Sequence, residues 1–190
     1  MAMKIRTTLN KKTAPACYTS PKYKFVNTPY DMWIHNGNCT HYAYARSCEL
    51  AGHDIYKTDF TSLPDAGGWY KKTKWNTGTV PRAGAIGECE HHVFIVERVN
   101  KDGSYLISES SYNDFIFQTR TIDTKVGEIY AKPSGKLLHF IYNPYVDEFD
   151  EVIDLLARDV IAGKYGNNPD RKNNIYKAVQ NRVNEILKNE

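Results

Sequence analysis

The sequence lacks several features that would assign it to a membrane, export or nucleic-acid class. None of its 190 residues belongs to a stretch approaching the roughly 20 consecutive apolar residues of a membrane span, so an integral membrane protein is excluded. The first residues contain no apolar segment of the secretory type, and we expect a protein held in the cytoplasm of the producing cell. The net charge is only +3, which gives no electrostatic argument for a nucleic-acid partner.

Closely spaced cysteine pairs are also missing. The four cysteines, Cys17, Cys39, Cys48 and Cys89, form no Cys-x-x-Cys motif. A chain of this length builds a core that needs no disulfide bonds, and the absence of an export leader indicates a reducing compartment. We therefore expect free thiols.

The order of the predicted elements indicates an α+β domain over residues 1–143. Residues 1–30 show no sustained periodicity and predict an extended lead-in. Residues 38–50 contain helix formers without Pro or Gly, with Asn38 as a candidate N-cap and Gly52 as the stop. Runs of β-branched and aromatic residues predict strands at 92–99, 104–110, 115–121 and 137–142.

The character of the chain changes after residue 143. Residues 144–147 begin with a proline and predict a linker. Within residues 147–190, apolar side chains recur at helical spacing on both sides of a glycine-containing turn. We expect a small helical module, close to the lower size limit for independent folding.

Cys39 is a candidate nucleophile because it stands at the start of the predicted helix. The positive end of the helix dipole and the free N–H groups there lower the pKa of a thiol. The same N–H groups can hold an oxyanion formed beside the sulfur. Cys48, nine residues further on, lies on the opposite side of the helix. The alternative is that Cys39 is a structural thiol.

Two adjacent histidines compete for the role of base. His91 and His92 lie at the edge of a predicted strand and therefore point to opposite faces. An even-numbered hairpin loop of two or four residues that ends at Gly103 places His92 on the same face as Glu109 and Ser111. His92 then has a carboxylate within reach, as a Cys–His–acid site for amide hydrolysis requires. The alternative is an ordinary cross-strand pair of polar side chains.

The same segment permits a zinc site. Cys89, His91 and His92 supply three potential ligands, and Cys17 or Cys39 would complete the site. The spacing matches none of the common ligand patterns, and adjacent histidines diverge. Zinc binding therefore stays open as a second hypothesis.

Residues 37–46, Gly-Asn-Cys-Thr-His-Tyr-Ala-Tyr-Ala-Arg, resemble the nucleophile motif of the CHAP domain, the cysteine, histidine-dependent amidohydrolase/peptidase of bacterial and phage cell-wall enzymes. Residues 81–86, 92–97 and 107–113 resemble the segments that lead into and form its His and acid strands. The resemblance spans about residues 30–143. It implies a papain-like α+β fold with Cys39 as nucleophile, His92 as base and Glu109 as the acid that orients the base.

The resemblance also bears on the surroundings of the site. Ser111 stands where the family often has Asn, and Asn113, on the same strand face, is a second possible supporting residue. The family chemistry implies no metal and no organic cofactor. Some members bind calcium through an acidic loop before the cysteine, but residues 30–38 offer only Asp31, so we expect no calcium.

The tail resembles the Cpl-seven-type cell-wall-binding repeat, through residues 156–167, Arg171 and residues 179–185. The resemblance implies a three-helix module that binds peptidoglycan. Gly163, Gly166 and Asn167 lie in its signature turn, and Arg171 follows that turn. The alternative is that the glycines only shape the turn and that Arg171 caps it or pairs with acids within the module.

The two resemblances together imply a hydrolase of bacterial peptidoglycan, most simply a phage or prophage endolysin that leaves the cytoplasm to act on the wall. The bond cleaved would be the N-acetylmuramoyl-L-alanine amide or a peptide bond of the cross-bridge. A host-encoded wall-remodelling hydrolase and a non-catalytic wall-binding protein are the alternatives.

Overall fold

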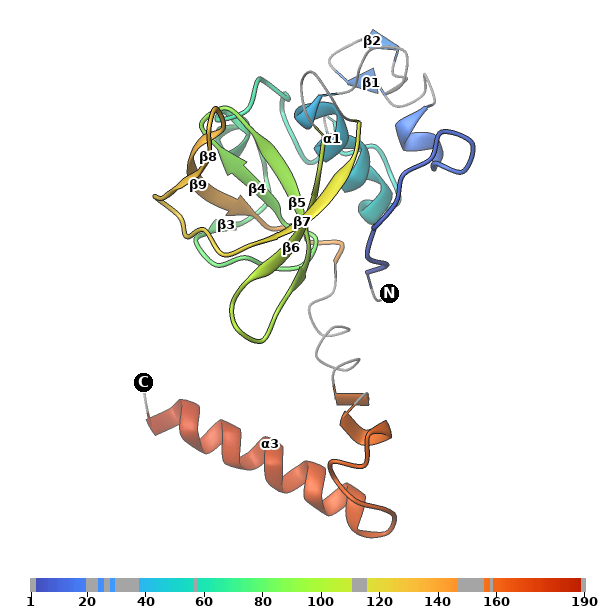
Figure 1. Cartoon of the computed structure of the whole chain (residues 1–190), viewed down its shortest axis with the longest axis vertical. Coiled ribbons are helices and arrows are strands. Elements are labelled where there is room, and N and C mark those ends of the chain that lie inside the picture. The colour runs from blue at the N-terminus through green and yellow to red at the C-terminus, as the bar shows by residue number, and fades with distance from the viewer. Residues whose placement is uncertain are drawn as a thin grey trace. The chain divides into compact units, whose positions relative to one another are not determined.

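The computed structural model of the protein describes residues 3–19, 24–25, 28–29, 38–56, 58–110, 116–146, 156–157 and 159–188. The chain divides into two compact units, Met3–Glu148 and Phe149–Glu190, and each is described by itself. In the first unit, one helix packs against an antiparallel sheet (Figure 1). The predicted α+β class is therefore confirmed.

Helix α1 spans Cys39–Ala51 and begins where the sequence predicts. The side-chain Oδ1 of Asn38, the N-cap, accepts a hydrogen bond from the N–H of His41 at 3.0 Å. Gly52 ends the helix in the left-handed region, with φ of 74°, which a glycine adopts without strain. These local interactions fix Cys39 as the first residue of the helix.

The main sheet has seven strands in the order β3-β9-β4-β5-β6-β7, with β8 paired to β9. Neighbouring strands are antiparallel. The sequence predicts β5, β6, β7 and β9 but not the shorter strands. The bounds are β3 Thr77–Gly78, β4 Ile86–Cys89, β5 Val93–Val99, β6 Tyr105–Glu109, β7 Gln118–Ile122, β8 Ile129–Ala131 and β9 Gly135–Ile141.

Two smaller features accompany the sheet. Strands β1, Lys24–Phe25, and β2, Thr28–Pro29, form a separate two-stranded pair. The short 3-10 helices η1, Ala16–Tyr18, and η2, Trp69–Lys71, lie in segments that the sequence predicts to be irregular. The expected lead-in of residues 1–30 thus contains some regular structure.

Both faces of the sheet are covered by apolar side chains. Val93 and Ile95 of β5 belong to the core that includes α1, whereas Phe94 and Val96 belong to a second core on the other face. Close packing in the second core requires a glycine at position 87, since a Cβ there would lie 2.1 Å from the Phe94 ring. The alternation explains why β5 reads as a continuous hydrophobic run.

The β5–β6 hairpin corrects the predicted loop. Val99 pairs with Tyr105, so the connection of residues 100–104 is odd-numbered rather than even. A β-bulge at Glu97, between the pairs Val96–Ile107 and Arg98–Leu106, adds one further residue to β5. The odd-numbered loop and the extra bulge residue each shift the strand pairing by one residue, so their effects cancel. Between the bulge and the start of β5, even-numbered residues of β5 therefore share a face with odd-numbered residues of β6, as predicted.

The bulge residue is tied to the helix. The Glu97 carboxylate is buried and accepts hydrogen bonds from Arg46 Nε and Nη2 of α1 at 3.0 and 2.8 Å. It also accepts one from the Ser108 hydroxyl at 2.6 Å and one from the N–H of Arg6 at 2.9 Å. A buried charge is tolerated only when it is paired in this way. The bulge, α1 and the N-terminal segment therefore form one polar network.

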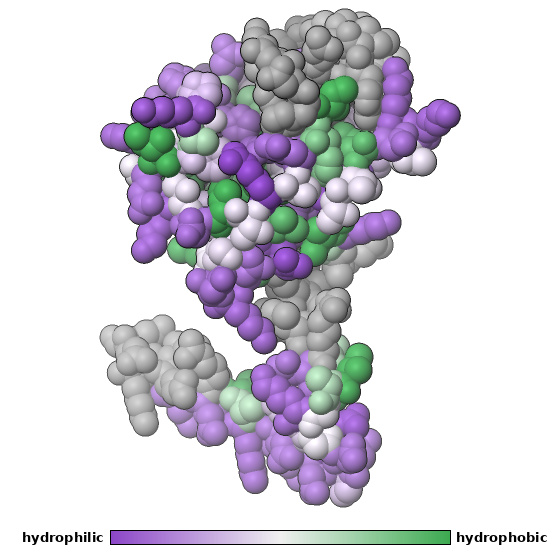
Figure 2. Space-filling model, in the orientation of Figure 1, coloured by the Kyte–Doolittle hydropathy of each residue, from purple (hydrophilic) through white to green (hydrophobic). Residues whose placement is uncertain are grey.

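The second unit contains α3, Asp170–Lys188, close to the predicted segment 170–187, and helical residues at 156–157 and 159–161. Among its described side chains, the large apolar ones that are exposed are Ile161, Tyr176 and Val179. None of the helices in the described ranges has the length and apolar content that a bilayer crossing needs. The visible surface is mostly hydrophilic, with scattered apolar residues (Figure 2).

Candidate active site

Three of the predicted site residues meet where β5 begins and β6 ends. Cys39, at the start of α1, forms a side-chain hydrogen bond with His92, in the turn before β5. His92 Nε2 donates to Glu109 Oε2, at the end of β6, over 2.7 Å. Because Nε2 faces the carboxylate, the other ring nitrogen, Nδ1, is the one directed to the sulfur. The arrangement is a continuous Cys–His–Glu chain.

The β-bulge at Glu97 determines that His92, and not His91, shares a face with Glu109. Without it, the pairing of Val99 with Tyr105 would extend unchanged along β5, and His91 rather than His92 would share a face with Glu109. Instead, His91 donates its backbone N–H to the carbonyl of Ser134. The predicted face of His92 is correct, although the predicted loop is not.

The surroundings of Cys39 favour the thiolate. Burial by itself raises the pKa of this thiol, but the hydrogen bond and the charge of His92, together with the backbone N–H groups of Val93 and Thr40, outweigh it and lower the pKa. Burial also opposes the imidazolium, yet the bonds to Cys39 and Glu109 raise the pKa of His92 to about 9. Both shifts favour an ion pair of thiolate and imidazolium over the neutral thiol and imidazole.

The other three cysteines behave differently. Burial raises the pKa of Cys17 and of Cys89 to about 12, and that of Cys48 further still. All four thiols are free. Cys39 is thus the cysteine of this chain that is partly exposed and whose pKa is lowered rather than raised.

Glu109 is held by more donors than the sequence indicates. Besides His92, it accepts from Gln118 Nε2 at 2.7 Å, from Arg120 Nε at 2.7 Å and from the Tyr130 hydroxyl at 2.9 Å. Arg120 Nη2 also donates to that hydroxyl. Burial raises the pKa of Glu109, but the bonds from His92 and Arg120 override it and lower the pKa to about 2. The carboxylate is ionised across the working range of most enzymes.

Sequence analysis does not identify these partners of Glu109. Gln118 pairs directly with Glu109 across β6 and β7, but a long connection separates the strands and leaves their register open. Tyr130 lies on β8, which the sequence did not predict. The supporting residues expected from the family pattern, Ser111 and Asn113, lie outside the described residues, as does most of the loop tested for calcium, residues 30–37.

The zinc alternative finds no support in the geometry. Both ring nitrogens of His92 are engaged, one by Cys39 and one by Glu109. Among the described residues, no group of three or more Cys, His, Asp or Glu side chains is arranged to hold a metal ion. Cys89 is fully buried in the core beneath the sheet.

The predicted wall-binding residues of the second unit lie in one turn, Gly163 to Asn167, and in the first turn of α3, at Arg171. Gly163 and Gly166 have φ of 76° and 74°, and the N–H of Gly166 donates to the carbonyl of Gly163 at 3.0 Å. Arg171 Nε donates to the carbonyl of Gly166 at 3.2 Å, and the N–H of Arg171 donates to the carbonyl of Asn167 at 3.1 Å. Arg171 therefore has a structural role in the turn whether or not it also contacts a ligand.

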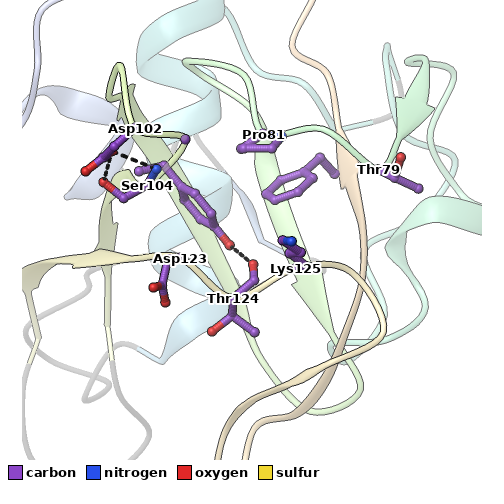
Figure 3. A pocket seen from close by; sticks show the side chains of 10 residues that line it. Thr79, Pro81, Asp102, Ser104, Asp123, Thr124 and Lys125 are labelled. Atoms are coloured by element: carbon purple, nitrogen blue, oxygen red, sulfur yellow. Dashed lines mark hydrogen bonds between the residues drawn. The ribbon is translucent and has the colours of Figure 1, made fainter.

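Figure 3 shows the residues that line a cavity of about 390 Å³, and none of them belongs to the Cys–His–Glu chain. The β5–β6 loop contributes Asp102 and Ser104 to its wall, and the segment after β7 contributes Asp123 and Lys125. These residues lie at the end of the sheet opposite His92. None of the described residues that line it is a cysteine or a histidine, so the cavity offers no second nucleophile or base.

Family models match two segments of the chain. The family model of the CHAP domain matches residues 29–111, and that of the CW_7 repeat matches residues 154–187. An N-acetylmuramoyl-L-alanine amidase domain-containing protein of Staphylococcus aureus (strain NCTC 8325 / PS 47) is 32% identical, over 53% of this chain and 18% of its own length. The chain therefore spans less than a fifth of that relative.

A crystal structure of an N-acetylmuramoyl-L-alanine amidase from Staphylococcus aureus is also similar, at 27% identity and a TM-score of 0.40. The match covers 60% of this chain and 31% of that one. The resemblances drawn from the sequence motifs are confirmed by the family matches. The chain carries a CHAP domain and, C-terminal to it, a CW_7 repeat.

Proposed function

We propose that the protein hydrolyses an amide bond of bacterial peptidoglycan through a thioester on Cys39. The observation that supports this most directly is the continuous hydrogen-bonded chain from the Cys39 thiol through His92 to Glu109, within a CHAP domain. It supplies a nucleophile, an acid–base group and an orienting carboxylate. The CW_7 repeat supports the wall as the place of action.

The reaction begins with attack of the Cys39 thiolate on the carbonyl carbon of the amide. The C–S bond forms while the carbonyl π electrons move to oxygen. The backbone N–H of Cys39, the first residue of α1, has no carbonyl partner within the helix, and we assign it to stabilise this oxyanion. His92 Nδ1 gives its proton to the amide nitrogen, the C–N bond breaks, and the amine leaves a thioester on Cys39.

Hydrolysis of the thioester restores the enzyme. Neutral His92 removes a proton from water, and the resulting hydroxide attacks the acyl carbon. The C–S bond breaks and returns the electron pair to the sulfur as thiolate, opposite the imidazolium, while the product leaves as a carboxylic acid. Throughout, the carboxylate of Glu109 accepts from Nε2 and keeps Nδ1 directed at the reacting atoms.

Lysis of purified cell walls tests the proposal. We expect Cys39→Ala to lower the rate of turbidity loss by roughly 10³-fold or more, because the nucleophile is removed. Cys17→Ala is the matched control, since this thiol lies outside the site and has a raised pKa. A chelator should leave the wild-type rate unchanged. Lysis that survives Cys39→Ala, or that a chelator abolishes, would refute the cysteine mechanism.

For the bond, we propose the N-acetylmuramoyl-L-alanine amide, on the strength of the amidase domain named in the relative. A cross-bridge peptide bond is the alternative that the same chemistry permits. Mass spectrometry of the digested wall distinguishes them. Free lactyl carboxylates on the glycan support the amidase, whereas new amino termini within intact muropeptides would contradict it.

We also propose that the CW_7 repeat retains the enzyme on the wall, and that the natural setting is a phage or prophage endolysin. The inactive Cys39→Ser protein should pellet with purified walls, and removal of residues 147–190 should weaken pelleting. Unchanged pelleting would refute a wall-binding role for the tail. An endolysin should lyse sensitive cells when it is supplied from outside, which a cytoplasmic housekeeping enzyme need not do.

A further inference from the structure

Arg120 is a charged residue in contact with the site that the mechanism does not use. It lies on β7, and its guanidinium faces the carboxylate of Glu109 with Nε at 2.7 Å and Nη2 at 3.5 Å. The guanidinium also lies 4.7 Å above the ring of Tyr130. The Tyr130 ring is nearly parallel to the His92 ring, at 13° and a centroid distance of 5.9 Å.

The ionised groups alternate in sign along this row. The Cys39 thiolate is followed by the His92 imidazolium, the Glu109 carboxylate and the Arg120 guanidinium. Each charge thus has an opposite charge beside it, and the row as a whole is neutral. Without Arg120, the described part of the site would carry one uncompensated, largely buried carboxylate, which is unfavourable.

We propose that Arg120 is a positioning residue that holds Glu109 against His92 and, through its charge, sets the upper pH limit of the reaction. This inference rests on the proposed cysteine mechanism. Two contacts from one planar guanidinium fix the carboxylate in rotation as well as in distance, which a lysine cannot do. The side chain of Glu109 is 1% exposed and that of Arg120 is 40% exposed, so solvent partly screens the guanidinium.

The direction of the effect follows from the charges around Glu109. The described groups that face it are His92 from the turn before β5, Gln118 and Arg120 from β7, and Tyr130 from β8. Among these, Arg120 opposes the influence of Glu109 on the imidazolium. Cys39 on α1 and Cys89 on β4 are the thiols whose electrostatic contacts reach His92 and Glu109.

Removing the positive charge therefore leaves the field of Glu109 less compensated and stabilises the imidazolium. We expect Arg120→Gln to move the alkaline limb of the kcat/KM profile upward by roughly half a pH unit, a shift kept small by solvent screening. Looser placement of the carboxylate should also lower kcat at neutral pH roughly 10-fold, with KM unchanged. Arg120→Lys keeps the positive charge but cannot make both contacts of the planar guanidinium. It should lower kcat while leaving the alkaline limb in place.

Arg82→Gln is the matched control, because its guanidinium also stacks on a tyrosine, 4.1 Å from the Tyr142 ring centroid, without contact to Glu109. Its rate and pH profile should equal those of the wild type. Thermal melting of each full-length variant establishes that the protein is folded. If Arg120 only stabilises the fold, its variants will contain a smaller fraction of folded, active protein, but the alkaline limb of their pH–rate profile will coincide with that of the wild type. That result would overturn the inference.

Titration of the His92 ring by NMR provides a readout that does not depend on wall hydrolysis. An upward shift of that titration in Arg120→Gln, absent in Arg120→Lys and in Arg82→Gln, supports the positioning role even if the wall is not the substrate. No shift in Arg120→Gln overturns it, even if wall hydrolysis is established. Failure of the inference and failure of the proposed function are thereby distinguished.

Discussion

The charge of Glu109 should be measurable in the pH dependence of the reaction. The pKa of His92 is raised from its ordinary 6.5 to about 9 against the opposing effect of burial, and hydrogen bonds to Cys39 and Glu109 are the main causes. The difference of about 2.5 units corresponds to about 3 kcal/mol in favour of the imidazolium, since each unit is 1.36 kcal/mol. The thiolate and the carboxylate share this stabilisation.

Glu109→Gln keeps an oxygen acceptor for Nε2 but removes the negative charge. If the carboxylate contributes roughly a third to a half of the stabilisation, the alkaline limb should fall by about one unit, from about 9 toward 8. Initial rates of wall solubilisation from pH 5 to 10 measure this limb. The reasoning is refuted if the wild-type limb is centred near 6.5, or if the limb of Glu109→Gln coincides with that of the wild type.

The shifted pKa values of His92 and Glu109 also predict how the stability of the fold changes with pH. Because the folded pKa of His92 lies above the unfolded value of 6.5, its stabilising contribution is complete below pH 6.5 and is lost as the pH rises through about 9. The pKa of Glu109 is lowered to about 2, so its contribution is present above about pH 4.5 and is lost as the pH falls toward 2. Thermal melting of His92→Ala beside the wild type should show a difference that narrows between pH 6.5 and 9.

Three further changes test the fold that supports the site. Arg46→Met should cost about 3–5 kcal/mol, because Glu97 then remains buried without its cation, and chemical denaturation measures the loss; an unchanged midpoint would contradict the importance of this pair. Gly87→Ala should cost about 1–3 kcal/mol, since its Cβ would overlap the Phe94 ring, and melting should show a clear drop. Asn38→Ala should cost about 1 kcal/mol of stability, because the N-cap hydrogen bond is lost. It should also slow alkylation of the Cys39 thiol by iodoacetamide. Equal alkylation rates would exclude a contribution of the N-cap to the reactivity of Cys39.

Local signals determine the parts of the site that the sequence predicts. The N-cap at Asn38 and the C-terminal stop at Gly52 each depend on residues a few positions away. The start of α1 and the location of Cys39 can therefore be predicted from the sequence. The strands β5 and β6 can be predicted for the same reason, from local runs of β-branched and aromatic residues. The partners of Glu109 on β7 and β8 depend on the register across long connections, which no local pattern encodes.

The choice between His91 and His92 shows how a non-local contact corrects a local expectation. An odd-numbered hairpin loop alone would bring His91 to the face of Glu109, and the bulge at Glu97 reverses this. What holds the bulge is a side chain of the helix: Arg46 donates to the Glu97 carboxylate from a position seven residues, or two turns, after Cys39. One face of α1 therefore supplies the sulfur at its start and, two turns later, the cation that stabilises the strand register on which the imidazole depends.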